Sequence, residues 1–189
     1  MKVYLIPLLL LFNVYCFSQS YSLPKGYGVY HTDGGNAEIR ADGDFDGDGV
    51  QDLAILCKGS DNSIMIAVFV SSEWDKNKYW YIMTKSEMWH FTYENSVLTM
   101  YSYNDDSYDV ELKFRYSKSL ENMRLIGYGE YYHELNSYGN QITTSSKSIN
   151  LATGKYEKNG VWGNINLPPI TLGNIEDYFA ELNNIGGDR

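Results

Sequence analysis

Alternation of apolar and polar residues runs through most of this chain and predicts a β-protein. The clearest case is residues 108–116, where aromatic and aliphatic side chains fill the even positions and charged side chains fill the odd ones. A period of two places the two kinds on opposite faces of a strand. Similar segments are 36–41, 52–57, 63–71, 79–84, 88–93, 97–103, 123–132 and 145–151. The short, turn-like gaps between them favour antiparallel hairpins over crossovers.

The C-terminal end has the period of a helix instead. From Ile175 to Leu182, apolar residues recur at i, i+3, i+4 and i+7, which forms one stripe along a helix. Asn174 can cap this helix, and Glu176 and Asp177 lie at the favourable end of its dipole. The predicted class is therefore all-β with a short C-terminal helix. A compact antiparallel barrel, a sandwich and a small propeller-like domain all agree with this pattern.

An aspartate-rich loop follows the first of these strands and predicts a calcium site. Its carboxylates stand at positions 1, 3, 5 and 9, counted from Asp44. Alternate side chains of a tightly turning backbone point inward, and calcium takes six to eight oxygen ligands. Gly49 stands at position 6, where the chain has to turn sharply. The predicted ligands are the carboxylates of Asp44, Asp46, Asp48 and Asp52 and the carbonyl of Val50.

This loop is of a calcium type but is not an EF-hand. Position 12 is Ile55, which supplies no bidentate carboxylate, and the apolar run after the loop has the length of a strand. Residues 43–54 resemble the calcium loops of the FG-GAP family, which occurs in integrin-type propellers. That resemblance implies a bound calcium ion, but it does not imply any particular biochemical activity. The alternative is a Gly/Asp-rich turn that binds nothing, although four like charges in nine residues repel each other without a cation.

The N-terminus has the pattern of a secretory signal. Met1 and Lys2 precede an apolar run over residues 3–12, which is too short to span a bilayer. Residues 1–18 are therefore predicted to be a signal peptide, and residues 19–189 a single domain in the periplasm or outside the cell, with no transmembrane segment. A lipoprotein acylated at Cys16 is the alternative, which Asn13 and Tyr15 disfavour.

The net charge limits the classes of partner, and the cysteine content limits disulfide formation. The formal net charge of −9 argues against nucleic acid and makes cationic proteins plausible partners. Removal of residues 1–18 leaves Cys57 as the only thiol, so no intramolecular disulfide can form. Cys57 ends an apolar run, and we expect it to be a buried, inert residue.

We expect no enzymatic activity from the sequence. His31, His90 and His133 are scattered without metal-ligand spacing, and the chain contains no Gly-x-Ser-x-Gly elbow or phosphate-binding loop. With 24 acidic residues, no carboxylate pair stands out. The 18 tyrosines instead favour a role in binding, because tyrosine suits both protein interfaces and sugar stacking.

Residues 131–140 are the predicted partner-binding loop, with three candidate contact residues: Tyr131, Tyr132 and Tyr138. The segment lies between two strand patterns and offers aromatic and carboxylate groups. An ordinary hairpin connection is the alternative.

A second resemblance covers about residues 36–160. Residues 112–116, 123–128 and 148–155, together with the aspartate loop, resemble a family of small exported bacterial β-proteins. The family includes a periplasmic immunity protein that inhibits a secreted peptidoglycan hydrolase, with a fold related to lysozyme inhibitors. The resemblance implies an exported calcium-binding protein that inhibits a lysozyme-like hydrolase, but no motif carries inhibitory residues over. The alternative function is a carbohydrate-binding or surface-adhesion module.

Overall fold

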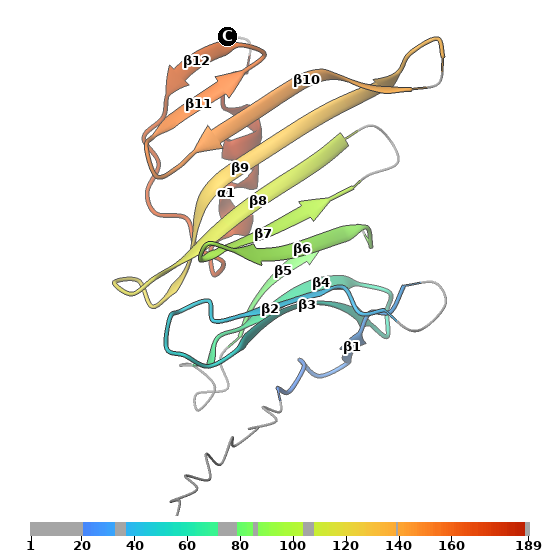
Figure 1. Cartoon of the computed structure of the whole chain (residues 1–189), viewed down its shortest axis with the longest axis vertical. Coiled ribbons are helices and arrows are strands. Elements are labelled where there is room, and N and C mark those ends of the chain that lie inside the picture. The colour runs from blue at the N-terminus through green and yellow to red at the C-terminus, as the bar shows by residue number, and fades with distance from the viewer. Residues whose placement is uncertain are drawn as a thin grey trace, which may run out of the picture.

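The computed structural model describes residues 21–32, 37–71, 79–84, 87–103, 108–138 and 140–187. These residues form two antiparallel sheets and one helix (Figure 1). The predicted signal peptide and Cys16 lie outside them. The all-β class with a short C-terminal helix is confirmed, and of the three architectures expected from the sequence the observed one is closest to a sandwich.

The smaller sheet contains the strand that follows the aspartate loop. Its strands are β1 (Tyr27–Val29), β2 (Arg40–Gly43), β3 (Asp52–Gly59), β4 (Ile64–Phe69) and β5 (Trp80–Thr84). The order is β1-β3-β4-β5, and β2 pairs with β3 beyond the end of β1. All six residues of β4 and the first six of β3 are buried, because both faces of this part of the sheet are covered.

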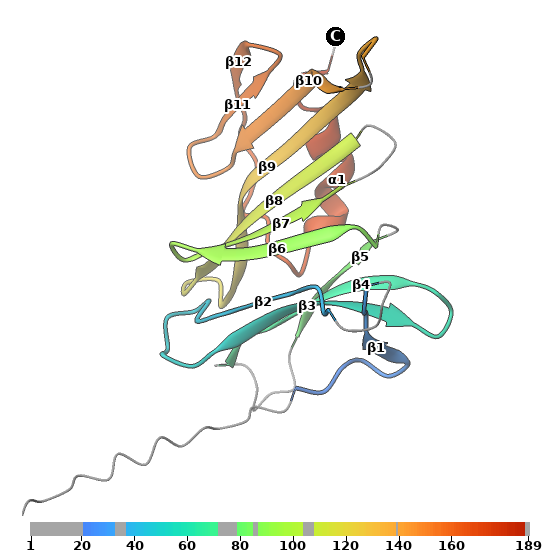
Figure 2. The same cartoon turned by 45° about the vertical axis from the view of Figure 1, so that its right-hand side comes forward.

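The larger sheet is a meander. Its strands are β6 (Trp89–Glu94), β7 (Val97–Ser102), β8 (Tyr108–Ser117), β9 (Asn122–Leu135), β10 (Gln141–Asn150), β11 (Lys155–Lys158) and β12 (Val161–Asn164). The helix α1 (Ile175–Asn184) covers one face of this sheet, and β6 lies beside β2 of the smaller sheet (Figures 1 and 2). The other face of the larger sheet is called the open face below.

Two apolar clusters follow from the alternation along β3. Ala54 and Leu56 belong to the main core, which also contains Phe114 of the larger sheet and Leu182 of α1. The odd-numbered residues of β3 face the other way into a second cluster: Leu53, Ile55 and Cys57, with Met65, Ala67 and Phe69 of β4. Residues of the N-terminal segment cover this second cluster, including Tyr21, whose ring lies 5.2 Å from that of Phe69. The smaller sheet is therefore an inner layer.

The predicted strands are found with ends shifted by up to four residues, the largest shifts being at the starts of β2 and β10, and residue 36 lies outside the described residues. Three further strands were not expected. β1, β11 and β12 have only three or four residues each, too few for alternation to be recognised. The prediction of a loop over residues 131–140 is wrong in its first half. β9 continues to Leu135, and only residues 136–140 separate it from β10. The strand continues because β10 supplies a pairing partner up to Gln141.

The predicted helix is also found, but Asn174 acts differently from the expected cap. Its side chain makes no hydrogen bond to the first turn of α1 and accepts the backbone N–H of Thr171 at 2.7 Å instead. Ile175 and Leu182 are fully buried, as the apolar stripe predicts. No helix in the described ranges is long and apolar enough to cross a membrane.

A buried ion pair fixes α1 to the larger sheet. The Lys147 ammonium lies 2.6 Å from the Glu130 carboxylate, and both side chains are nearly inaccessible to solvent. The same ammonium donates to the carbonyls of Leu182 and Asn183 at 2.9 and 3.0 Å. These carbonyls lie at the C-terminal end of α1, where the helix dipole stabilises a cation. Burial lowers the pKa of Lys147, and the bond to Glu130 opposes that shift.

Cys57 should react slowly with a thiol reagent in the native protein. Its side chain is fully buried, and burial raises the pKa of the thiol to about 12, so almost no thiolate is present near neutral pH. We expect a reaction with a disulfide reagent at pH 8 that is at least about 100-fold slower than in denaturant. Colour release measured under both conditions tests this, and rapid labelling of the native protein would identify Cys57 as reactive.

Candidate metal centre

The aspartate loop connects β2 to β3 and is anchored by an aromatic pair. Phe45 is buried inside the loop, and its ring centroid lies 4.8 Å from that of Tyr93 on β6. The Tyr93 hydroxyl donates to the backbone carbonyl of Asp44. The larger sheet therefore holds the start of the loop, although the loop itself belongs to the smaller one.

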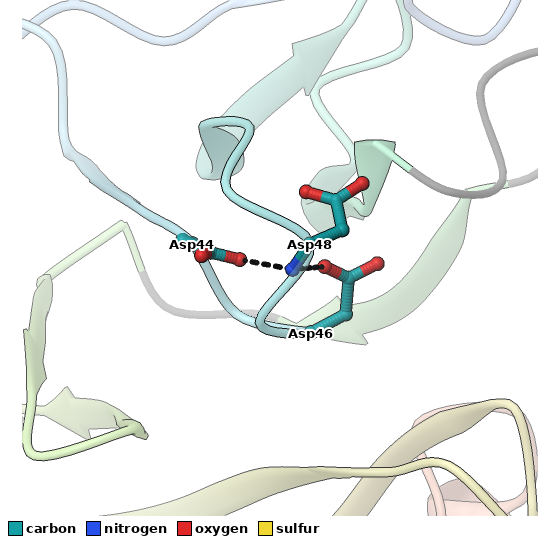
Figure 3. A group of neighbouring side chains, drawn as sticks. All are labelled: Asp44, Asp46 and Asp48. Carbon is teal, nitrogen blue, oxygen red and sulfur yellow. Dashed lines mark hydrogen bonds between the residues drawn. The ribbon is translucent and has the colours of Figure 1, made fainter.

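Three of the four predicted carboxylates come together. Asp44, Asp46 and Asp48 each place an oxygen within 4.8 Å of the other two, and Figure 3 shows them around the backbone N–H of Asp48. That N–H donates to Asp44 and to Asp46, both at 3.0 Å. Within the described residues this is the one group of acidic, histidine or cysteine side chains close enough together that it could hold a metal ion.

The loop is shaped by hydrogen bonds to Asp44 and by two glycines. The Asp44 carboxylate accepts the N–H groups of Gly47 at 2.7 Å and Gly49 at 2.9 Å, besides that of Asp48. Both glycines have positive φ, +79° and +88°, which other residues rarely adopt. The sharp turn predicted at Gly49 is present, and it brings alternate carboxylates to the same side.

Asp52 lies beneath the loop with its carboxylate turned toward the backbone. One oxygen accepts the N–H groups of Phe45 and Asp46, and the other accepts the N–H of Ser71. Its side chain is almost fully buried and is not one of the three grouped carboxylates. Burial raises the pKa of Asp52 to about 6, and the backbone hydrogen bonds from Ser71 and Phe45 oppose that shift. Asp52 thus closes the loop, and its direct contact with an ion stays a prediction.

Val50 stays a predicted ligand in the same way. It is partly exposed, and its N–H donates to the Asp48 carboxylate at 2.7 Å. Ser71, just after β4, was not expected from the sequence: its hydroxyl donates to Asp48 at 2.7 Å. Nothing in the local sequence could have revealed Ser71 or Tyr93, since both are far from the loop in the chain.

The donor set suits calcium. Its side-chain donors are carboxylate oxygens, the hard ligands that calcium prefers, and no imidazole or thiolate is among the grouped residues. Asp46 is buried, whereas Asp44 and Asp48 are more accessible, so an ion can approach from solvent. The residues present therefore fit the ion that the sequence predicts.

Gly43→Ala should destabilise the protein and loosen the loop. A Cβ at Gly43 would lie 2.1 Å from a ring carbon of Tyr93, so the ring that holds Asp44 would have to move. Overpacking of this kind costs about 1–3 kcal/mol. The matched control is Gly28→Ala on β1, where a Cβ would meet nothing within 4 Å. Equal urea midpoints for both variants would contradict this account of Gly43.

The three predicted partner-binding tyrosines do not form one surface. Tyr131 and Tyr132 are neighbours on β9, so their side chains point to opposite faces. Tyr131 lies over Gly129 on the open face, while the ring of Tyr132 lies 4.8 Å from that of Tyr108. Tyr138, in the turn, is 86% exposed.

Known proteins add nothing to this description of the site. No protein-family model matches the chain, and neither a curated protein nor a solved structure is detectably similar to it. The functional conclusions therefore rest on the residues of the chain itself.

Proposed function

We propose that this chain is an exported binding protein whose fold is stabilised by one calcium ion at Asp44, Asp46 and Asp48. The gathering of these three carboxylates within 4.8 Å is the observation that supports the metal most directly. Without a cation, three negative charges this close repel one another. A bound ion would remove the repulsion and hold the β2–β3 connection.

We further propose that the partner is a lysozyme-like peptidoglycan hydrolase, which the protein inhibits. The net charge of −9 suits a basic enzyme. The β9–β10 hairpin supports the same partner, because its tip lies at the end of the larger sheet away from the smaller one (Figures 1 and 2). Leu135 and Tyr138 at this tip are 73% and 86% exposed, so large apolar groups are free to enter a cleft.

A turbidity assay with lysozyme-like hydrolases of several types tests this function. We expect inhibition at micromolar concentrations of the calcium-loaded protein, and an affinity at least about tenfold lower for Tyr138→Ala, since truncating an interface aromatic typically costs more than 1 kcal/mol. The matched control is Tyr81→Ala on β5, an exposed tyrosine of the other sheet. If none of these hydrolases is inhibited, the proposed inhibitory function is wrong. If inhibition is unchanged in Tyr138→Ala and Tyr132→Ala, the β9–β10 hairpin is not the surface that binds the hydrolase.

Binding of a glycan is the second candidate function. Tyr103 is 51% exposed on the open face, and its ring lies edge-on to Tyr101 with centroids 4.6 Å apart. Such rings can stack on sugars. Retention of the protein on a muropeptide column, lost in Tyr103→Ala, would favour this function over inhibition.

A further inference from the structure

Three side chains that are far apart in the sequence meet on the open face of the larger sheet. Asp109 comes from β8, His133 from β9 and Thr143 from β10. The strand register brings them together, because His133 is paired with Thr143, and Asp109 is paired with Tyr131, two residues before His133. Side chains two residues apart on a strand share a face.

These residues form a continuous chain of hydrogen bonds. His133 Nε2 lies 3.0 Å from an oxygen of Asp109, and His133 Nδ1 lies 3.1 Å from the Thr143 hydroxyl. The Tyr101 hydroxyl donates to the same Asp109 oxygen at 2.6 Å. The side chains of His133 and Asp109 are only 13% and 8% exposed, whereas Thr143 is exposed.

The chemistry of Asp109 assigns the protons of this chain. An ionised carboxylate can only accept, so the Nε2 of a neutral His133 carries the hydrogen and donates to Asp109. Nδ1 then holds a lone pair, and the Thr143 hydroxyl donates its proton to it. A hydroxyl, a base and an acid that orients the base are the parts of an activated nucleophile.

We propose that Thr143 is the nucleophile of an acyl-transfer site, with His133 as its general base and Asp109 as the residue that positions the imidazole. The Thr143 oxygen attacks the carbonyl carbon of a carboxylic ester while its proton passes to Nδ1 of His133. The bond to the alcohol oxygen then breaks, and that oxygen takes the proton from His133. Water, deprotonated by His133, hydrolyses the acyl-threonine and regenerates the hydroxyl.

Tyrosine side chains on the open face favour a substrate whose ester group is attached to an aryl or sugar ring. Tyr131 lies beside His133 on the same face, and its ring covers Gly129, where a Cβ would come within 3.1 Å of a ring carbon. The Tyr101 hydroxyl donates to Asp109, and the Tyr101 ring centroid lies 4.6 Å from that of the half-exposed Tyr103. β7 is separated from Thr143 on β10 by β8 and β9, so these rings would stack on the aryl or sugar part of an extended substrate and not at the ester carbonyl itself. This activity goes beyond binding and requires neither calcium nor a hydrolase partner.

The test uses p-nitrophenyl acetate with the mature protein. We expect nitrophenolate release, and mass spectrometry of rapidly quenched samples should find an acetyl group on Thr143. Thr143→Ala and His133→Gln should slow the release about 100-fold or more, as expected when a nucleophile or a general base is lost, and Thr143→Ser should retain it. The matched control is Thr144→Ala, because that hydroxyl bonds to the Tyr132 carbonyl. His90→Gln on β6 controls for an exposed imidazole.

The positioning role of Asp109 is tested with a measurement that a purely structural role would not change. Nitrogen NMR of the wild-type protein should find the hydrogen of neutral His133 on Nε2, and Asp109→Asn should shift it to Nδ1, where it blocks proton transfer from Thr143. A His133 already protonated on Nδ1 in the wild type would overturn the proposal. Acetylation only at other residues, or release by Thr143→Ala at the wild-type rate, would overturn it as well.

Discussion

Replacing Lys147 with methionine is expected to lower the free energy of unfolding by about 3–5 kcal/mol, because it leaves the Glu130 charge buried without its partner. Glu130 and Lys147 are only 4% and 3% exposed, so water cannot replace the ammonium. The variant also removes the donor to two carbonyls at the end of α1, which are costly to leave unpaired. Urea unfolding followed by circular dichroism measures the loss.

Two comparisons separate the buried charge from other effects of this substitution. The matched control is Lys113→Met, since Lys113 also pairs with a glutamate, Glu111, at 2.9 Å, but its side chain is 43% exposed. We expect a change within about 1 kcal/mol there. Lys147→Met combined with Glu130→Gln should recover part of the stability, because the unpaired charge is gone. A loss of the same size in Lys113→Met and Lys147→Met would contradict the role of burial.

Removal of calcium is expected to lower the melting temperature. A ligand that binds only the folded state adds about 2.7 kcal/mol at a free concentration of one hundred times Kd. For a domain of this size that corresponds to roughly 5–10 °C. Thermal melts in chelator and in millimolar calcium measure the difference, and calorimetric titration gives the stoichiometry, which should be one ion.

Substitutions in the loop connect this effect to particular carboxylates. Asp46→Asn should remove most of the calcium response, because Asp46 is one of the grouped carboxylates. Asp61→Asn, an exposed position in the turn between β3 and β4, serves as the control and should respond like the wild type. Equal melting temperatures in chelator and calcium, with no heat of binding, would remove the metal from the proposed function.

Local sequence patterns were sufficient for the parts of the molecule that depend on neighbouring residues. The alternation in β8 and the spacing of Asp44, Asp46 and Asp48 act within about ten residues, so they can be read along the chain. Alternation also placed Asp109 correctly on the face opposite the core. It could not predict that this carboxylate is buried there, since its cover comes from Tyr101 and His133 on the neighbouring strands.

Side-chain contacts between paired strands were beyond the reach of the sequence. The pairing of Lys147 with Glu130 requires the register of β9 against β10, and the neighbourhood of His133 requires that of β8 as well. Register is fixed by turns, bulges and the burial of whole faces. Nothing in the sequence therefore connects the His133 imidazole with the Asp109 carboxylate. The end of β9 was misplaced for the same reason: its last three residues continue the strand because they pair with β10.

The position of β3 as an inner layer has a consequence for amide hydrogen exchange. Six successive residues of this strand are buried, and each of its edges is paired with another strand. Its amides should exchange only when the whole domain opens, whereas those of β12, a short edge strand with largely exposed side chains, should exchange through local fraying. Asp52, which closes the aspartate loop, is the first residue of β3. An ion held by that loop should therefore slow exchange throughout the core.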